Sequence, residues 1–208
     1  MEKEIFIVRH GETDYNRKGI IQGSGIDSDL NELGYRQAAA FYNHYKDEGF
    51  ELVITSNLLR THQTAAPFIE AGLPHIVAPE IREISWGIYE GQTYSPEVGK
   101  EYKRLINAWA GKDLSMAMKG GESAEQLSKR LLLFMDQLKS LPQKKILVVS
   151  HGRTIRCMMC LFNQLPMKAM EQFSHANTGL FVVRMQAEKN VVKYLNDIRH
   201  LESLSLPI

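Results

Sequence analysis

The sequence has little cysteine, and its charges nearly cancel. Only two of the 208 residues are cysteines, Cys157 and Cys160, so no disulfide framework can be built. The 25 lysines and arginines almost balance the 24 aspartates and glutamates, which excludes a general attraction to nucleic acid or to an anionic membrane surface. Any affinity for anions must therefore be local.

Long apolar segments are also missing. No apolar run approaches the ~18 residues of a membrane span, and the opening MEKEIF lacks the basic start and apolar stretch of a secretory signal. Together with the low cysteine content, these absences lead us to expect a cytoplasmic protein. Cys157 and Cys160 have the spacing of a redox pair, but they fall inside a predicted helix, so we expect them in the core. With no histidines close by, they do not predict a zinc site.

The sequence is rich instead in apolar runs that alternate with helical patterns. Apolar residues make up 44% of the chain, enough for the full core of one domain. The predicted strands are 4–10, 51–56, 75–79, 144–152, 179–185 and 191–197, and the predicted helices are 31–49, 58–72, 123–138 and 153–162. This order predicts an α/β fold, a three-layer α/β/α sandwich with a mostly parallel sheet.

Residues 87–121 fit neither a buried strand nor a long core helix. They are of mixed polarity, helical in parts, and rich in glycine at both ends. We interpret them as a small helical cap, inserted in a single domain that spans residues 1–208 and lying over the sheet. After this segment, Ser123 and Gln126 fit a capping box at the start of the next helix.

Three of the predicted strands end in polar and cationic side chains. They are Arg9-His10-Gly11, Ser56-Asn57 with Arg60 shortly after, and Ser150-His151-Gly152. A single strand-end histidine is more often structural. Two His-Gly pairs with two arginines favour a binding site, because parallel strands present their carboxyl ends at one edge. Burying these cations together is costly without an anion, and arginine forks match phosphate oxygens, so the pattern predicts a site for a phosphate-like dianion.

Five sequence blocks resemble one known family. The blocks are RHGET (9–13), SNLLRTHQTA (56–65), REISWGIYEG (82–91), GGES (120–123) and VVSHG (148–152). In this order and spacing they resemble the histidine phosphatase superfamily, also called phosphoglycerate mutase-like, and within it the phosphatase branch. The resemblance implies the phosphoglycerate mutase-like version of the predicted α/β fold.

The resemblance also implies a role for each matching residue. His10 matches the nucleophile that takes up the phosphoryl group, and Glu83 matches the acid that protonates the departing alkoxide. His151 matches a second histidine, which we expect to be protonated as it holds the phosphoryl oxygens. The implied phosphate contacts are Arg9, Asn16, Arg60, His151 and Gly152, and the implied substrate contacts are Gln22 and Gly23.

The implied activity is metal-independent hydrolysis of a small-molecule phosphomonoester, without a cofactor and with inorganic phosphate as product. No nucleic-acid or membrane partner is expected, and a homodimer is left open. One alternative is a phosphoglycerate mutase, although mutases of this family usually have longer chains. The other is a non-catalytic phosphate-binding module, but a mere binder needs neither a nucleophile nor an acid.

Some positions depart from the family, and these bear on specificity rather than on reactivity. Ile20 stands where an arginine is common, and Arg153 stands where a glycine is frequent. We expect Arg153 to point to solvent, and His175, in the loop SHANTG, to stay outside the pocket. The aromatic residues of the cap region are expected mainly to pack the cap onto the sheet; they are Trp86, Tyr89, Tyr94, Tyr102 and Trp109.

Overall fold

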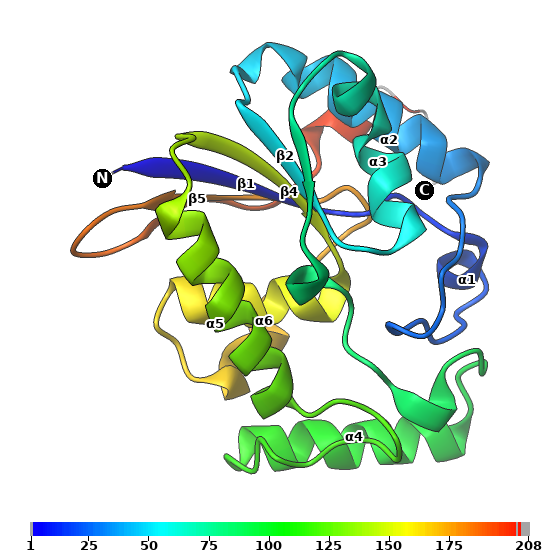
Figure 1. Ribbon diagram of the computed structural model, residues 1–208. Helices are drawn as coiled ribbons and strands as arrows, with labels where there is room; N and C mark the ends of the chain where they lie inside the picture. The colour runs from blue at the N-terminus through cyan, green and yellow to red at the C-terminus, as the bar shows by residue number, and fades with distance from the viewer. Residues whose placement is uncertain (1, 203, 205–208) are drawn as a thin grey trace.

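The computed structural model describes residues 2–202 and 204, and within them six strands form one sheet (Figure 1). The strand order is β3-β2-β4-β1-β5-β6. The parallel strands are β1 (Lys3–Arg9), β2 (Leu52–Thr55), β3 (His75–Val77) and β4 (Lys145–Ser150). An antiparallel hairpin completes the sheet with β5 (Leu180–Met185) and β6 (Val191–Asp197). The prediction of a mostly parallel α/β sheet is confirmed.

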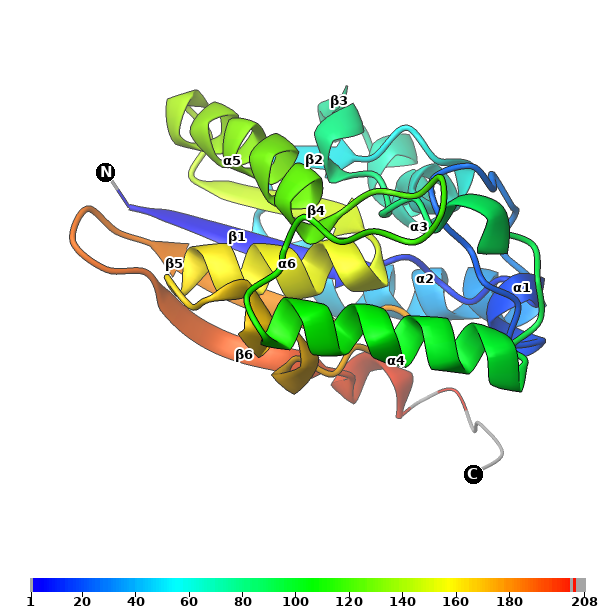
Figure 2. The ribbon, with the colours of Figure 1, turned by 90° about the horizontal axis from the view of Figure 1, so that it is seen from below.

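Helices cover both faces of this sheet (Figures 1 and 2). One layer is formed by α2 (Glu32–Tyr45) and α3 (Leu59–Glu70), and the other by α5 (Ala124–Ser140) and α6 (Gly152–Phe162). Along β1, Phe6 and Val8 pack in the α2–α3 layer, whereas Ile5 and Ile7 pack in the α5–α6 layer. Because both faces are buried, the parallel strands are continuous apolar runs.

Two helices of the structure begin at capping side chains. At the start of α2, the side chain of Asn31 accepts a hydrogen bond from the backbone N–H of Gly34 at 2.9 Å. Ser123 and Gln126 form the expected capping box at the start of α5. These bonds satisfy N–H groups that the first turn leaves without a partner. The 3₁₀ helix Lys46–Glu48 that continues α2 ends at Gly49, whose φ of +76° favours glycine.

The predicted cap, residues 87–121, contains the helix α4 (Pro96–Ala110). Ser95 caps this helix and Pro96 occupies its first position, as is common at helix starts. α4 packs on the 3₁₀ helix Met167–Gln172, and in Figure 1 it lies beyond α5 and α6. The expectation that the segment lies over the sheet is therefore wrong, because the helical layer separates α4 from the strands.

The remaining helical turns are short, and the loop after β1 is joined to the cap. These turns are α1 (Asp14–Arg17) and the 3₁₀ helices Lys46–Glu48, Pro79–Ile81, Gly87–Tyr89, Met167–Gln172 and Arg199–Leu201.

The backbone N–H of Ile21 donates to Gln92 O at 2.9 Å, and that of Gly91 donates to Ile21 O at 2.9 Å. These bonds hold the loop that follows β1 against the start of the cap.

The helix α6 is a core helix that carries both cysteines. Cys157 and Cys160 are fully buried and unpaired, and burial raises the pKa of the two thiols to about 11 and about 12. The prediction that they belong to the core is confirmed. Neither α6 nor any other helix in the described part of the chain is long and apolar enough to cross a membrane.

Candidate active site

The ends of β1 and β4 bring the two strand-end histidines together. The strands are neighbours in the sheet, with Arg9 paired to Ser150. The backbone N–H of His10 donates to Ser150 O at 3.0 Å, and the ring centroids of His10 and His151 lie 5.2 Å apart. The convergence expected at the carboxyl ends of parallel strands is therefore present.

One hydrogen bond determines the tautomer of His10. Its Nδ1 lies 2.7 Å from the carbonyl oxygen of Gly11. Because a carbonyl only accepts, we assign the proton to Nδ1, which leaves the lone pair on Nε2. Burial, with the charges of Arg60 and Arg9, lowers the pKa of His10 well below its ordinary value. The ring is therefore a neutral imidazole with Nε2 available as a nucleophile.

His151 is held between a guanidinium and a hydroxyl. Nε–H of Arg60 donates to Nδ1 of His151 at 3.2 Å, so Nε2 carries the proton and donates to Ser56 Oγ at 2.8 Å. Burial and the charge of Arg60 lower the pKa of His151 well below its ordinary value. His151 is therefore neutral in this arrangement, because a proton on Nδ1 would face the Arg60 N–H. Its protonation while it holds phosphoryl oxygens stays a prediction.

Arg60, in the first turn of α3, has no exposed surface. Its Nη1 donates to Ile26 O at 2.7 Å and its Nη2 donates to Gly23 O at 3.3 Å. Burial lowers its pKa from the usual value, but a guanidinium stays charged at neutral pH. Within residues 2–202 and 204 its hydrogen-bond partners are all neutral. The carboxylates of Glu83, Asp27 and Glu90 act on it only through space, so a bound anion would add a direct charged partner for this buried cation.

Arg9 is the second guanidinium beside the histidines. Its Nη1 lies 3.3 Å from Nδ1 of His175, and its buried Nε has no hydrogen-bond partner among the described residues. Burial lowers the pKa of Arg9 to about 10, which still leaves it charged at pH 7. The His175 ring also packs on Gly152, where a Cβ would lie 2.7 Å from Cε1. His175 therefore lies at this site, and the expectation that it stays outside is wrong.

Glu83 is buried and its carboxylate caps the start of α6. Oε2 accepts from the Arg153 N–H at 3.1 Å, and Oε1 accepts from the N–H and the hydroxyl of Thr154 at 3.1 and 3.0 Å. These N–H groups have no partner inside the helix, and His151, the residue before the helix, makes no side-chain cap. Glu83 is thus held next to the turn that follows His151.

Two asparagines connect α1 to the backbone of His10. Asn16 forms a capping box with Thr13 at the start of α1, and its Oδ1 accepts from Nδ2 of Asn177 at 3.2 Å. The same Nδ2 donates to His10 O at 3.0 Å. We did not predict Asn177, although its loop, SHANTG, drew attention for its histidine. A loop asparagine carries no periodic signal that would identify such a contact.

Gln22 and Gly23 connect the site to the cap. Nε2 of Gln22 donates to Thr13 Oγ1 at 2.6 Å, while the carbonyl of Gly23 accepts from Arg60. The carboxylate of Glu90 lies so close to Gly23 that a Cβ there would overlap it. Glu90 was not predicted as part of the site. The sequence block 82–91 contains both Glu83 and Glu90, and only Glu83 was assigned a role.

Arg153 is buried, with 6% of its surface exposed, and the expectation that it points to solvent is wrong. Its guanidinium lies 5.7 to 5.8 Å from the ring centroids of Trp86, Tyr102 and Trp109. It also binds the carboxylate of Glu171 and the hydroxyl of Tyr102. Ring faces and a carboxylate stabilise a buried guanidinium. A position on the first turn of a helix does not reveal that a second helix covers it.

The cap aromatics divide into buried and exposed residues. Trp86 and Trp109 are 9% and 1% exposed and pack the cap, as predicted. Tyr94 is 67% exposed, yet it lines a small cavity together with Trp86 and Tyr102. Some of these rings therefore face an open space rather than only the core.

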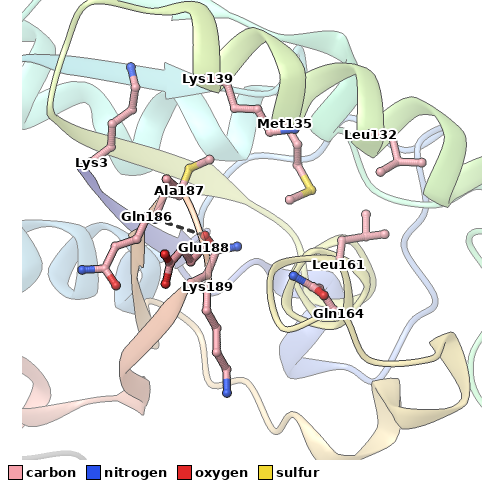
Figure 3. Close-up of a pocket in the computed structure, with 12 residues that line it drawn as sticks. Lys3, Leu132, Met135, Lys139, Leu161, Gln164, Gln186, Ala187, Glu188 and Lys189 are labelled. Carbon is pink, nitrogen blue, oxygen red and sulfur yellow. Dashed lines mark hydrogen bonds between the residues drawn. The ribbon is translucent and has the colours of Figure 1, made fainter. Parts of the chain in front are cut away.

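The larger cavity in Figure 3 lies away from the two histidines. It has a volume of about 520 Å³, and its lining comes from β1, α5, α6 and the turn between β5 and β6. Lys3, the first residue of β1, lies on this cavity, whereas His10 follows the last residue of the same strand. None of the candidate site residues lines it.

Taken together, the strand ends form a cationic site around a neutral nucleophile. Two guanidiniums and two imidazoles surround it, with a carboxylate at the adjacent helix start. In the described part of the chain, no group of three or more His, Cys, Asp or Glu side chains is arranged to hold a metal ion. Such a site is suited to bind a phosphoryl group and to present Nε2 to it.

Comparisons with known proteins agree with this geometry. The family model of the histidine phosphatase superfamily (branch 1) matches residues 5–198. "Putative phosphoserine phosphatase 2" of Hydrogenobacter thermophilus is 29% identical over 98% of this chain and 100% of its own. "Probable phosphoglycerate mutase GpmB" of Yersinia pestis is 32% identical over 98% and 97%. A solved mycobacterial glucosyl-3-phosphoglycerate phosphatase, in complex with VO3, is 26% identical and covers 93% of this chain and 98% of its own, with a TM-score of 0.82.

Proposed function

The chain belongs to the histidine phosphatase superfamily (branch 1), and from this membership we propose that it hydrolyses a small phosphomonoester through a phosphohistidine on His10. The observation that carries the proposal is the tautomer of His10. Its Nδ1–H is bound to a carbonyl, and its Nε2 is free beside two guanidiniums and a second imidazole. A pure binding site would need the cations but would have no need of a neutral imidazole with a free nitrogen.

In the first step, Nε2 of His10 attacks phosphorus and the bond from phosphorus to the ester oxygen breaks. The oxygen leaves as an alcohol once it has taken a proton from Glu83. Arg9, Arg60 and the backbone N–H of Gly152 stabilise the charge on the phosphoryl oxygens. His151 lies beside His10 and orients these oxygens.

In the second step, water attacks the phosphorus of phosphohistidine and the phosphorus–nitrogen bond breaks. The carboxylate of Glu83 accepts a proton from this water, which restores the acid, and the electron pair of the broken bond returns to Nε2 of His10. Inorganic phosphate leaves as the second product. Splitting hydrolysis in two lets one positioned carboxyl group serve both steps.

The names of the relatives do not identify the ester. They refer to phosphoserine, glucosyl-3-phosphoglycerate and a phosphoglycerate mutase, which differ in size and charge. We propose one domain over residues 1–208 in which 87–121 is the cap, with Gln22 and Gly23 on the substrate side. The homodimer, the cytoplasmic location and the independence from metal remain predictions.

The test is to trap the phosphoenzyme with a ³²P-labelled phosphomonoester by rapid quenching. We expect an acid-labile, alkali-stable label on the wild-type protein and none on His10→Ala, whose kcat/KM should fall at least about 10⁴-fold. His44→Ala is the matched control, because His44 is exposed and lies in α2. Phosphate release without any label, or a label that survives in His10→Ala, would refute the proposal.

A phosphoglycerate mutase is the second candidate, because one relative with that name is 32% identical to this chain. The length argument does not separate the two activities, since the alignment covers 97% of that relative. A mutase must protect phosphohistidine from water, so the rates on 3-phosphoglycerate distinguish them. Efficient isomerisation with negligible hydrolysis would replace the phosphatase assignment.

A further inference from the structure

The cap covers a small cavity whose walls are mostly apolar. Its volume is about 260 Å³, and its lining includes Trp86, Tyr94, Val98, Tyr102 and Met118. None of its lining side chains carries a charge. A charged group placed here would lose its hydration without gaining a counter-charge, whereas an apolar group would gain from burial.

One wall of this cavity adjoins the phosphate site. Gln22 lines the cavity, and its Nε2 donates to Thr13 Oγ1 at 2.6 Å, in the segment that directly follows His10. The next residue, Gly23, binds Arg60 through its carbonyl oxygen. A single dipeptide therefore separates the cavity from the buried guanidinium.

A second part of the lining is connected, through Arg153, to the carboxylate that we propose as the acid. Trp86 and Tyr102 line the cavity, and the guanidinium of Arg153 lies against both rings at 5.8 and 5.7 Å. The backbone N–H of Arg153 donates to Glu83 Oε2 at 3.1 Å. In the proposed reaction the leaving oxygen must lie beside Glu83, and Arg153 connects that position to the rings of the cavity.

We infer that this cavity binds the alcohol portion of the substrate, and that it selects an uncharged apolar group, such as an aryl or alkyl chain, over a group that bears a carboxylate. The inference rests on the proposed function, because it places the leaving group through Glu83. The size agrees: a cavity of about 150 Å³ accommodates benzene, so 260 Å³ holds a ring with a short chain.

The test compares three esters of primary alcohols: propyl phosphate, 3-phenylpropyl phosphate and phosphoserine. Each buried methylene-sized unit favours binding by about fourfold. A six-carbon ring that is half buried counts as about three such units, so we expect kcat/KM for 3-phenylpropyl phosphate to exceed that for propyl phosphate about 60-fold. Phosphoserine should be no better than propyl phosphate. Calorimetric binding of the phenylpropyl and propyl phosphonates gives the same comparison without turnover.

Gly99 on α4 offers a variant that should preserve the fold. A Cβ at Gly99 would overlap the ring of Tyr94, and alanine is a better helix former than glycine. Gly99→Ala should therefore move the ring and reduce the phenylpropyl preference about fivefold. Val98→Phe should fill the cavity and abolish the preference. The matched control is Leu133→Phe, at a side chain on α5 that is 62% exposed, which should leave the preference unchanged.

Failure of this inference differs from failure of the proposed function. Hydrolysis of all three esters without a phenylpropyl preference, or with phosphoserine as the best substrate, would overturn the apolar subsite and leave the phosphatase intact. A preference that persists in both Gly99→Ala and Val98→Phe would move the subsite elsewhere and also overturn the inference. Absence of phosphoenzyme with every ester would remove both, because the inference places the alcohol portion through the proposed reaction on His10.

Discussion

The phosphate site at the strand ends and the cavity under the cap differ in how their side chains are held. Arg60 and His151 have no exposed surface, and each is bound through both sides of its polar group. The cavity is apolar, and its outer wall, Tyr94, is 67% exposed. Most polar groups that are buried away from water have hydrogen-bond partners. An apolar wall has no such groups, so only its shape decides what fits against it.

In our proposal the strand-end site performs the reaction, whereas the cap cavity selects the substrate. The charged side chains at the strand ends are bound to backbone carbonyl oxygens and to N–H groups at the start of α6. A substitution there therefore disturbs the edge of the sheet as well as the reaction. A change in the cavity wall alters what fits beside the leaving oxygen and little else. Arg153 belongs to both regions, because its backbone N–H binds Glu83 while its side chain lies among the cap rings.

The largest effect expected from a conservative change is that of Glu83→Gln at the strand-end site. The amide keeps an oxygen for the donors at the start of α6 but cannot protonate a leaving group. We expect hydrolysis of propyl phosphate to slow about 10²-fold or more, and that of p-nitrophenyl phosphate less than about tenfold, because nitrophenolate leaves without a proton. The measurement is kcat for each ester.

Comparing two esters in one variant controls for damage to the fold, which would slow both alike. The wild-type ratio of the two rates is the reference. Equal slowing of both esters would mean that Glu83 only caps α6, and the acid would have to be sought elsewhere.

The residues that perform this chemistry could be predicted from the sequence because the sheet positions them. Apolar runs that end in Arg9-His10 and Ser150-His151 indicate parallel strands, and parallel strands end at one edge. Glu83 came from the family resemblance alone, since a segment without periodicity gives no position. The structure shows what holds Glu83 in place: its carboxylate accepts hydrogen bonds from the N–H groups in the first turn of α6.

The residues that the sequence could not predict lie where tertiary packing decides the outcome. Asn177 reaches His10 across 167 residues through a loop without a pattern. Arg153 was assigned to solvent because charged residues on a helix surface usually are exposed. The cap helix that covers it could be recognised in the sequence, but its docking partner could not.

The second comparison tests Arg153, the residue shared by the two regions. Arg153→Ala keeps the N–H that binds Glu83 but removes a guanidinium that contacts three rings and Glu171. We expect the free energy of unfolding to fall by about 2 kcal/mol, from lost cation–π and ion-pair contacts. Urea unfolding measures it.

The matched variant for this test is Arg156→Ala. Arg156 binds the same Glu171, but it has no ring contact among those of the described residues. Arg156→Ala should lower the free energy of unfolding by less than about 1 kcal/mol, as the loss of a partly exposed ion pair usually does. Equal losses for the two variants would show that the rings contribute nothing and that the cap is held by Glu171 alone.

The smallest expected effect concerns His175, which lies against Arg9 at the rim of the phosphate site. Burial, followed by the charges of Arg9, Arg156 and Arg153, lowers the pKa of His175 to about 3. The unfolded histidine takes up a proton near pH 6.5. Between these two values the unfolded chain binds more protons than the folded one, so the contribution of His175 to stability is lost as the pH falls below about 6.5.

We therefore expect His175→Gln, whose amide oxygen can still accept from Arg9, to weaken the acid sensitivity of the fold. From pH 7 to pH 5 the wild-type protein should lose roughly 1 to 2 kcal/mol more unfolding free energy than the variant. Urea unfolding at both pH values in phosphate-free buffer gives this difference. The contributions of the other buried histidines to the pH dependence cancel, because both proteins contain them. Identical losses in the two proteins would mean that water reaches His175 freely, and that the rim of the phosphate site is as open as the mouth of the cap cavity.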